Sequence, residues 1–291
     1  MEVKNPFSIY DFLGYLFPGA LALLILFAIY KMIKETGTIL PFDYHAVLKF
    51  LISPKDEVNL TKILVPFILL SYILGHMSSY LSSITIEYIT NRFYMYPSKY
   101  LLNIMDGKTP KERLNEEDSV SPKLKKRILW VLKKIFFPIL VIPFNSKLFN
   151  AFITRPLEPY LGNNINKKIK DLFKELNMEG DYNECDDFHR LVMHYVHLNM
   201  PASNRKADNY IALYGFLRAT TLIMVLFTDF IIVTMLLSIF VNFGQSINWS
   251  SVMLLISCWL ISIICYMGYI KFYRRFTQEN LMSLLTGKWH D

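Results

Sequence analysis

The chain has 291 residues, of which 53% are hydrophobic and only 19% are charged, with a mean hydropathy of +0.29 and a formal net charge of +7. Because ordinary soluble domains carry about a quarter charged residues, this composition indicates a membrane protein and excludes a disordered chain. Three cysteines are too few for a secreted disulfide framework.

Two apolar runs near the beginning of the chain are long enough to cross a membrane. Nineteen residues without a formal charge follow Asp11, and 24 more extend from Ile63 to Ile86. At about 1.5 Å per residue, each run approaches or exceeds the thickness of a hydrocarbon core of about 30 Å. We therefore predict a first transmembrane pair in residues 1–86, with spans at about 12–33 and 63–86.

The next segment, residues 87–210, is predicted to be a basic helical domain. Residues 87–217 hold 20 Lys and Arg against 15 Asp and Glu. After Asp187, apolar residues recur at helical spacing, namely Phe188, Leu191, Val192, Tyr195 and Val196. A further helix is expected to open near Ser203 and to continue into the third span, and no stretch shows strand-like alternation.

A second transmembrane pair is predicted in residues 211–270. The 41 residues from Phe230 to Ile270 carry no formal charge and are too long for one span. The polar stretch from Gly244 to Trp249 divides them into spans at about 213–243 and 251–270, followed by an amphipathic tail, 271–291.

The positive-inside rule gives the expected orientation of these spans. Lys and Arg are absent from the short loop between the last two spans and present in the tail, which places both termini and the inserted domain in the cytoplasm. The sequence thus predicts an all-α membrane protein with four transmembrane helices and a helical cytoplasmic domain inserted between spans two and three.

Asp229 lies near the middle of the third span, where a carboxylate costs several kcal/mol and normally faces water or a partner. One interpretation is that Asp229, with Thr228 beside it, lines the pore of an oligomer. The other is that Asp229 is hydrogen-bonded inside one bundle, to His76 or to a Ser hydroxyl of the second span. Arg218 is about 16 Å away along the helix axis and is expected to snorkel to the interface.

His76 belongs to a polar stretch of the second span. Small residues recur there every three or four positions, at Ser71, Gly75, Ser78 and Ser82. This spacing favours close packing of membrane helices. The alternative is that the stretch, including His76, lines a wet pathway.

Two groups of basic residues are candidates for contact with anions. The first surrounds a short apolar segment and comprises Lys123, Lys125, Lys126, Arg127, Lys133 and Lys134; the second comprises Lys167, Lys168 and Lys170. Contact with anionic membrane lipids is one interpretation. Binding of an anionic nucleotide or oligonucleotide is the other.

Signals for enzymatic activity are absent from the sequence. It contains no phosphate loop, no dinucleotide glycine pattern and no Gly-x-Ser-x-Gly elbow. His194 and His197 lack the additional ligands typical of a zinc site. We therefore expect no catalytic residue, no metal and no cofactor, and keep a membrane lipid hydrolase with His76 or His194 as general base as a minor alternative.

Two stretches resemble a known group of proteins. They are NPFSIYDFLGYLFPGALAL and HYVHLNMPASNRKADNYIALYGFLRATTLIMVL, which resemble prokaryotic membrane proteins that accompany anti-phage defence genes, and in particular the Hailong-type membrane effector. The resemblance implies a gated oligomeric channel in the inner membrane that responds to a nucleic-acid-like ligand made by a partner nucleotidyltransferase. It also implies that Tyr214, Gly215, Phe216 and Arg218 lie at the junction of ligand domain and pore.

We therefore expect the chain to form a homo-oligomer, with a tetramer favoured, that acts as a ligand-gated pore and depolarises the membrane. The anionic nucleotide or oligonucleotide would bind the cytoplasmic domain. The alternative is a structural or scaffolding membrane protein that recruits a soluble partner or holds lipid.

Overall fold

The computed structural model describes residues 11–36, 60–104, 153–185, 187–241 and 249–287, together with short pieces between 107 and 139. Within these residues 88% are helical and none lies in a strand. Four of the described helices are long and apolar enough to cross a membrane, namely Phe12–Tyr30, Leu64–Leu101, Lys206–Phe240 and Trp249–Thr286. The prediction of an all-α, multi-pass membrane protein is thereby confirmed.

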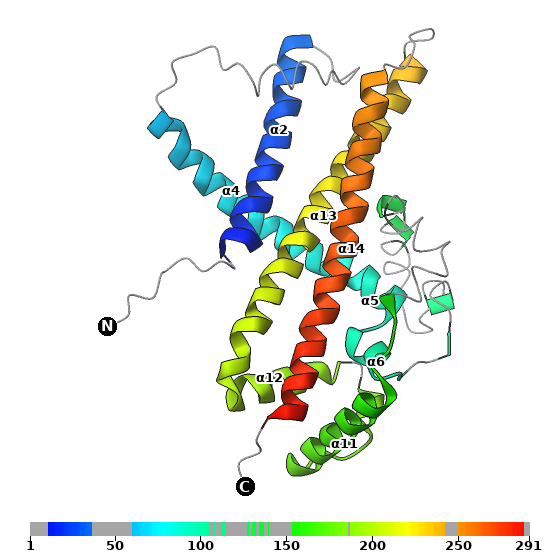
Figure 1. Cartoon of the computed structure of the whole chain (residues 1–291). Coiled ribbons are helices and arrows are strands. Elements are labelled where there is room, and N and C mark those ends of the chain that lie inside the picture. Colours follow the sequence, from blue (N-terminus) through cyan, green and yellow to red (C-terminus); the bar gives the residue numbers. More distant parts are fainter. Residues whose placement is uncertain are drawn as a thin grey trace.

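The first two membrane helices pack against each other through small residues. The π-helix η1 (Phe12–Leu16) leads into α2 (Phe17–Thr36), and α4 (Leu60–Ser82) crosses α2 obliquely (Figure 1). A Cβ atom on Gly19 would overlap the Ser71 carbonyl oxygen, and one on Gly75 would overlap the Tyr15 carbonyl oxygen. This close approach of two backbones agrees with the packing interpretation of the small residues in the second span.

The second membrane helix continues beyond residue 86, where the sequence predicted its end. After α4 come the π-helix η2 (Ser83–Glu87) and α5 (Tyr88–Tyr94), and the short α6 (Pro97–Leu101) follows. The charge of Glu87 marked the end of the apolar run in the sequence. In the fold this charge is accommodated inside a continuing helix, because it is paired as described below.

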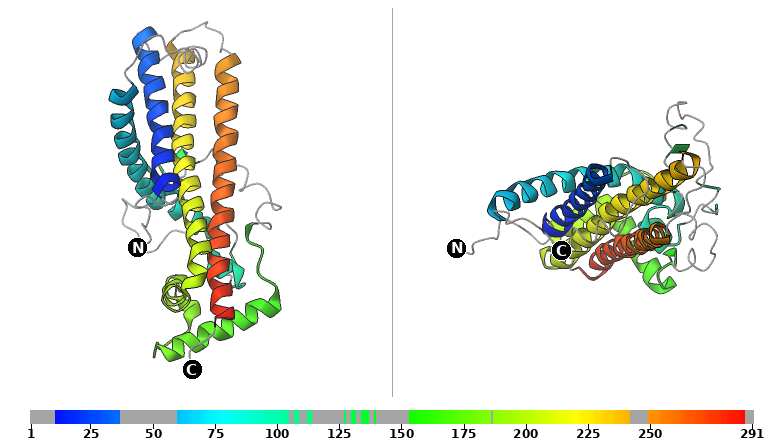
Figure 2. Two further views of the ribbon diagram at one scale, coloured as in Figure 1. Left: turned by 60° about the vertical axis from the view of Figure 1, so that its left-hand side comes forward. Right: turned by 90° about the horizontal axis from the view of Figure 1, so that it is seen from above.

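The last two membrane helices form an antiparallel hairpin longer than a bilayer is thick. Helix α13 (Pro201–Val241) has 41 residues and α14 (Trp249–Thr286) has 38, which corresponds to about 60 Å of helix. The two helices lie side by side along their length (Figures 1 and 2). The tail predicted from residue 271 therefore begins as a direct continuation of the fourth span.

The half of the hairpin that carries the start of α13 and the end of α14 is called the base here. Helix α11 (Pro159–Glu175) and helix α12 (His189–Asn199), with the short 3-10 helix η3 (Tyr182–Glu184) between them, pack at the base (Figure 2). The membrane helices α2 and α4 flank the opposite half of the hairpin. The chain thus has two parts. The four-helix part comprises α2, α4 and the adjoining half of the hairpin, and the helical part comprises α11, α12 and the base. Helices α13 and α14 run through both.

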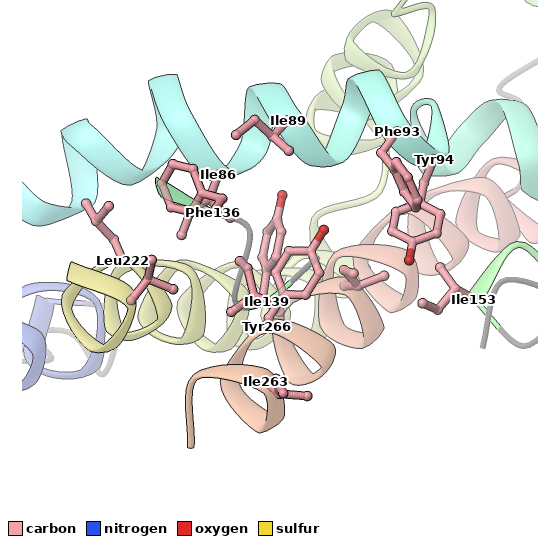
Figure 3. Close-up of a cluster of buried hydrophobic side chains, with 13 residues drawn as sticks. Ile86, Ile89, Phe93, Tyr94, Phe136, Ile139, Ile153, Leu222, Ile263 and Tyr266 are labelled. Carbon is pink, nitrogen blue, oxygen red and sulfur yellow. The ribbon is translucent and has the colours of Figure 1, made fainter. Parts of the chain in front are cut away.

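Two hydrophobic cores hold these parts together. The first core lies where α5 crosses α13 and α14, and it buries Ile89, Phe93 and Leu222 beside Tyr266 (Figure 3). The second core joins α11 and α12 to the end of α14 through Ile169, Val192, Leu281 and Leu284, among others. Burial of these apolar side chains fixes the helical part to the hairpin.

Candidate functional site

Asp229 lies on a face of α13 that the other described residues leave largely open. Its neighbours at helical spacing, Leu226, Val233 and Leu236, are 48%, 52% and 49% exposed, and Asp229 itself is half-buried. Within the described part of the chain, Asp229 makes no hydrogen bond or ion pair. A carboxylate therefore stands within an exposed apolar stripe in the four-helix part.

Two other residues predicted to line the pore, Thr228 and His76, lie in environments different from that of Asp229. Thr228 is buried, and its hydroxyl donates to the Met224 carbonyl oxygen at 2.7 Å. His76 is exposed on α4, stacks on the Tyr15 ring with 3.8 Å between ring centroids, and contacts the edge of Tyr72. The structure thus brings His76 to the first membrane helix and does not join it to Asp229.

Arg218, which the sequence analysis allowed to snorkel to the membrane surface, is paired inside the chain. The side chain of Arg218 is only 11% exposed, and its Nη1 atom forms an ion pair with Glu87. Its Nε atom also donates to the Ser82 hydroxyl at 3.2 Å. Because Ser82 is the last residue of α4 and Glu87 the last of η2, these bonds tie α13 to both ends of the π-helix in the second membrane helix.

Glu87 is the residue that sequence reasoning missed. It follows the apolar run directly, and its partner is 131 positions away in the chain, so no local spacing links the two. The one available signal was that Glu87 directly follows the predicted second span and that Arg218 lies near the start of the predicted third span. A π-helix, which η2 forms here, is also a frequent feature of functional sites, and no local pattern predicted it.

Tyrosine rings surround the ion pair between Arg218 and Glu87. The guanidinium carbon of Arg218 lies 5.8 Å from the centroid of the Tyr214 ring. The Tyr214 ring in turn lies 5.3 Å from that of Tyr273 and 6.4 Å from that of Tyr269. These aromatic side chains and the burial of Arg218, whose side chain is 11% exposed, lower the local dielectric and so strengthen the attraction between the charges. We call Arg218, Glu87 and Ser82 the polar lock.

The two predicted groups of basic residues are only partly described. Lys123, Lys125, Lys126 and Lys133 lie outside the described residues, whereas Arg127 is exposed and the Lys134 ammonium lies 3.9 Å from the centroid of the Trp130 ring. Lys167, Lys168 and Lys170 lie on α11, whose buried side belongs to the second core. Lys134 adjoins Ile135 and Phe136 of the first core, so Lys134 and the lysines of α11 are attached to different cores.

The histidines considered for zinc do not form a ligand set. Asp187 is bound to Arg190 by an ion pair of 2.8 Å, and His194 is exposed. Among the residues that the structure describes, no group of three potential ligands is close enough to hold a metal ion. The polar face of α12 therefore carries an ion pair and solvent-exposed side chains.

Comparison with known proteins adds no relative to these observations. No family model matches the chain, and neither a curated protein nor a solved structure is significantly similar to it. The resemblance to Hailong-type effectors therefore stays a prediction.

Proposed function

We propose that the chain is one subunit of an oligomeric, ligand-gated pore in the inner membrane of a prokaryote, where it acts as an immune effector by depolarising the cell. In this proposal the base faces the cytoplasm and receives an anionic nucleotide or oligonucleotide. A homo-oligomer is required, with a tetramer favoured, because four helices per chain leave too little room for a channel within one subunit.

The observation that carries the proposal is the environment of Asp229. An ionisable side chain in a membrane helix costs several kcal/mol unless water or a partner solvates it. The described part of the chain supplies no hydrogen bond or ion pair to Asp229, and the surrounding stripe on α13 is apolar and exposed. A second copy of the chain packed beside this stripe would enclose Asp229 in a shared, water-filled passage.

The hairpin offers a physical route from the base to the membrane. Helices α13 and α14 run without interruption from the base to the four-helix part, so a shift of α11 or α12 at the base moves Asp229 on the same rigid element. The polar lock holds α13 against the second membrane helix on this route. A ligand would change the pore only if it binds one arrangement of the hairpin more tightly than the other.

Planar bilayer recordings of the purified protein test the proposal. We expect wild-type protein to conduct cations in preference to anions, because a ring of carboxylates attracts cations. The Asp229→Asn variant is expected to lose this preference, which a shifted reversal potential in a salt gradient would reveal. Asp208→Asn is the matched control, since Asp208 is an exposed carboxylate of the same helix, near its start.

Two outcomes would contradict the proposal. If wild-type protein is monomeric in lipid nanodiscs and never conducts, a structural or scaffolding role is favoured. If the protein conducts but Asp229→Asn and Asp208→Asn leave the reversal potential equally unchanged, Asp229 does not line the passage.

A further inference from the structure

A cavity of about 410 Å³ lies against α13 and α14 at the base. Four basic side chains and one carboxylate contribute to its wall, namely Lys206, Lys271, Arg274, Arg275 and Glu279. The wall thus carries three more positive than negative charges. None of these residues belongs to the basic groups that the sequence singled out.

The cationic side chains come from one face of α14. Lys271, Arg274 and Arg275 are spaced by three and four positions, which places them next to one another on a helix. The Nη2 atom of Arg274 donates to the Arg155 carbonyl oxygen at 2.7 Å and is thereby fixed in orientation. Lys271 and Arg275 are exposed, and within the described residues neither forms an ion pair with a carboxylate. The Lys271 ammonium lies 5.8 Å from the centroid of the Phe272 ring. Two charges at the cavity are therefore not neutralised by a carboxylate and can attract an anion.

Glu279 and Lys206 bridge the two helices at the edge of the cavity. The Lys206 ammonium lies 2.8 Å from each of the two carboxylate oxygens of Glu279. An anion in the cavity would be attracted by Lys206 and repelled by Glu279. The carboxylate is consequently the one charge of the wall that opposes anion binding.

The cavity has an apolar end as well as a cationic one. Met267, one turn before Lys271 on α14, and Ile270, directly before Lys271, contribute to its wall, and this end points toward the four-helix part. The basic residues follow on the side of the base. A molecule with a phosphate at one end and an uncharged, partly apolar body at the other matches this order of side chains.

We infer that the cavity binds a phosphate ester, with the phosphate between Lys271, Arg274 and Arg275 and the rest of the molecule against Met267 and Ile270. Arginine side chains bind phosphate oxygens through two parallel hydrogen bonds, and lysine adds a point charge. Basic pockets of this kind beside membrane helices bind anionic lipid headgroups, and the same chemistry suits a water-soluble phosphate ester. The inference does not depend on the pore, because binding is measurable whether or not the protein conducts.

Two probes on full-length protein in nanodiscs distinguish the sources of the phosphate. The first probe is phosphatidylglycerol, mixed at low fraction into phosphatidylcholine nanodiscs and followed by native mass spectrometry of the retained lipid. The second is ATP, titrated calorimetrically into nanodiscs of phosphatidylcholine alone. Retention of the lipid identifies a membrane source, and saturable binding of ATP identifies a soluble one.

Three variants test the location of the site. Lys271→Gln with Arg275→Gln is expected to weaken binding of the responding probe by roughly tenfold or more. Glu279→Gln is expected to strengthen it, because the opposing carboxylate is gone. The matched control, Lys167→Gln with Lys170→Gln, removes the same charge from the exposed surface of α11 and should leave affinity within about twofold.

The inference is overturned if neither probe binds saturably to wild-type protein. It is also overturned if the two double variants lose affinity equally, because attraction would then come from the general positive charge of the base. The test stays valid if one variant lowers the yield of folded protein. The Lys271/Arg275 variant is expected to weaken binding and Glu279→Gln to strengthen it, and poor folding cannot strengthen binding.

Discussion

The polar lock makes a quantitative prediction about how α13 is held to the second membrane helix. In a double-mutant cycle, Glu87→Gln removes the charge that pairs with Arg218, Arg218→Met removes the other, and the third variant combines both. Stranding one partner of a buried ion pair costs about 3–5 kcal/mol, whereas replacing both partners is often nearly neutral.

The exposures of the two side chains set the expected size of each effect. The Arg218 side chain is 11% exposed and that of Glu87 is 28% exposed, so an unpaired Arg218 is harder to hydrate than an unpaired Glu87. We expect Glu87→Gln to lower the free energy of unfolding by about 3 kcal/mol, Arg218→Met by about 2 kcal/mol, and the double variant by less than the sum of these. The coupling free energy should therefore be about 2 kcal/mol.

Equilibrium unfolding in bicelles, with the four proteins measured side by side, gives the coupling free energy directly. The ion pair between Asp187 and Arg190 is the surface control, because the Arg190 side chain is 79% exposed, and its coupling should not exceed about 0.5 kcal/mol. Additive effects of Glu87→Gln and Arg218→Met, within about 0.5 kcal/mol, would refute the conclusion that these residues form a buried pair.

Two further predictions concern packing and pH. Gly75→Ala should lower the free energy of unfolding by about 1–3 kcal/mol, because the added Cβ overlaps the Tyr15 carbonyl oxygen. Gly215→Ala, where the added Cβ meets open space, should be neutral or stabilising in the same unfolding assay. Equal effects of the two variants would contradict this prediction. Burial between α12 and α14 lowers the pKa of His189 from 6.5 to about 4. Between pH 6.5 and pH 4 the unfolded chain therefore binds a proton that the folded chain does not, and the free energy of unfolding should fall by about 3 kcal/mol as the pH drops through this interval. The His189→Leu variant should lack this part of the pH dependence, and an unchanged pH profile in the variant would refute the assignment.

Much of the helical architecture was accessible from local patterns. The length of the apolar runs predicted four membrane helices, and the spacing of Phe188, Val192 and Val196 predicted the buried face of α12. A helix opening near Ser203 and entering the third span corresponds to α13, which begins at Pro201. These features depend on hydrophobic length and period, which a single sequence records directly.

The pairing of polar side chains was not accessible in the same way. Glu87 and Arg218 meet because two helices cross at a particular height, and neither residue carries a local mark of the other. The cationic cavity likewise requires Lys206 of α13 and Arg275 of α14 to face the same space. Such contacts depend on the packing of distant segments, and charge counting along the chain cannot predict them.

The water accessibility of position 229 tests the proposed passage most directly. We would replace the three free cysteines, Cys185, Cys258 and Cys265, and introduce Asp229→Cys or, as control, Ile256→Cys. The ion pair between Lys206 and Glu279 shows which residues of the hairpin lie level with each other. Counting 23 residues from each partner places Ile256 near the level of Asp229, and Ile256 is also exposed on the surface of the chain.

A charged, membrane-impermeant thiosulfonate reagent is then applied to the protein in lipid vesicles, and the modified fraction is measured by mass spectrometry. If Asp229 faces a water-filled passage between subunits, Asp229→Cys reacts readily while Ile256→Cys, facing lipid, does not. If Asp229→Cys is as unreactive as Ile256→Cys, position 229 lies in a dry environment and the proposed pore is contradicted.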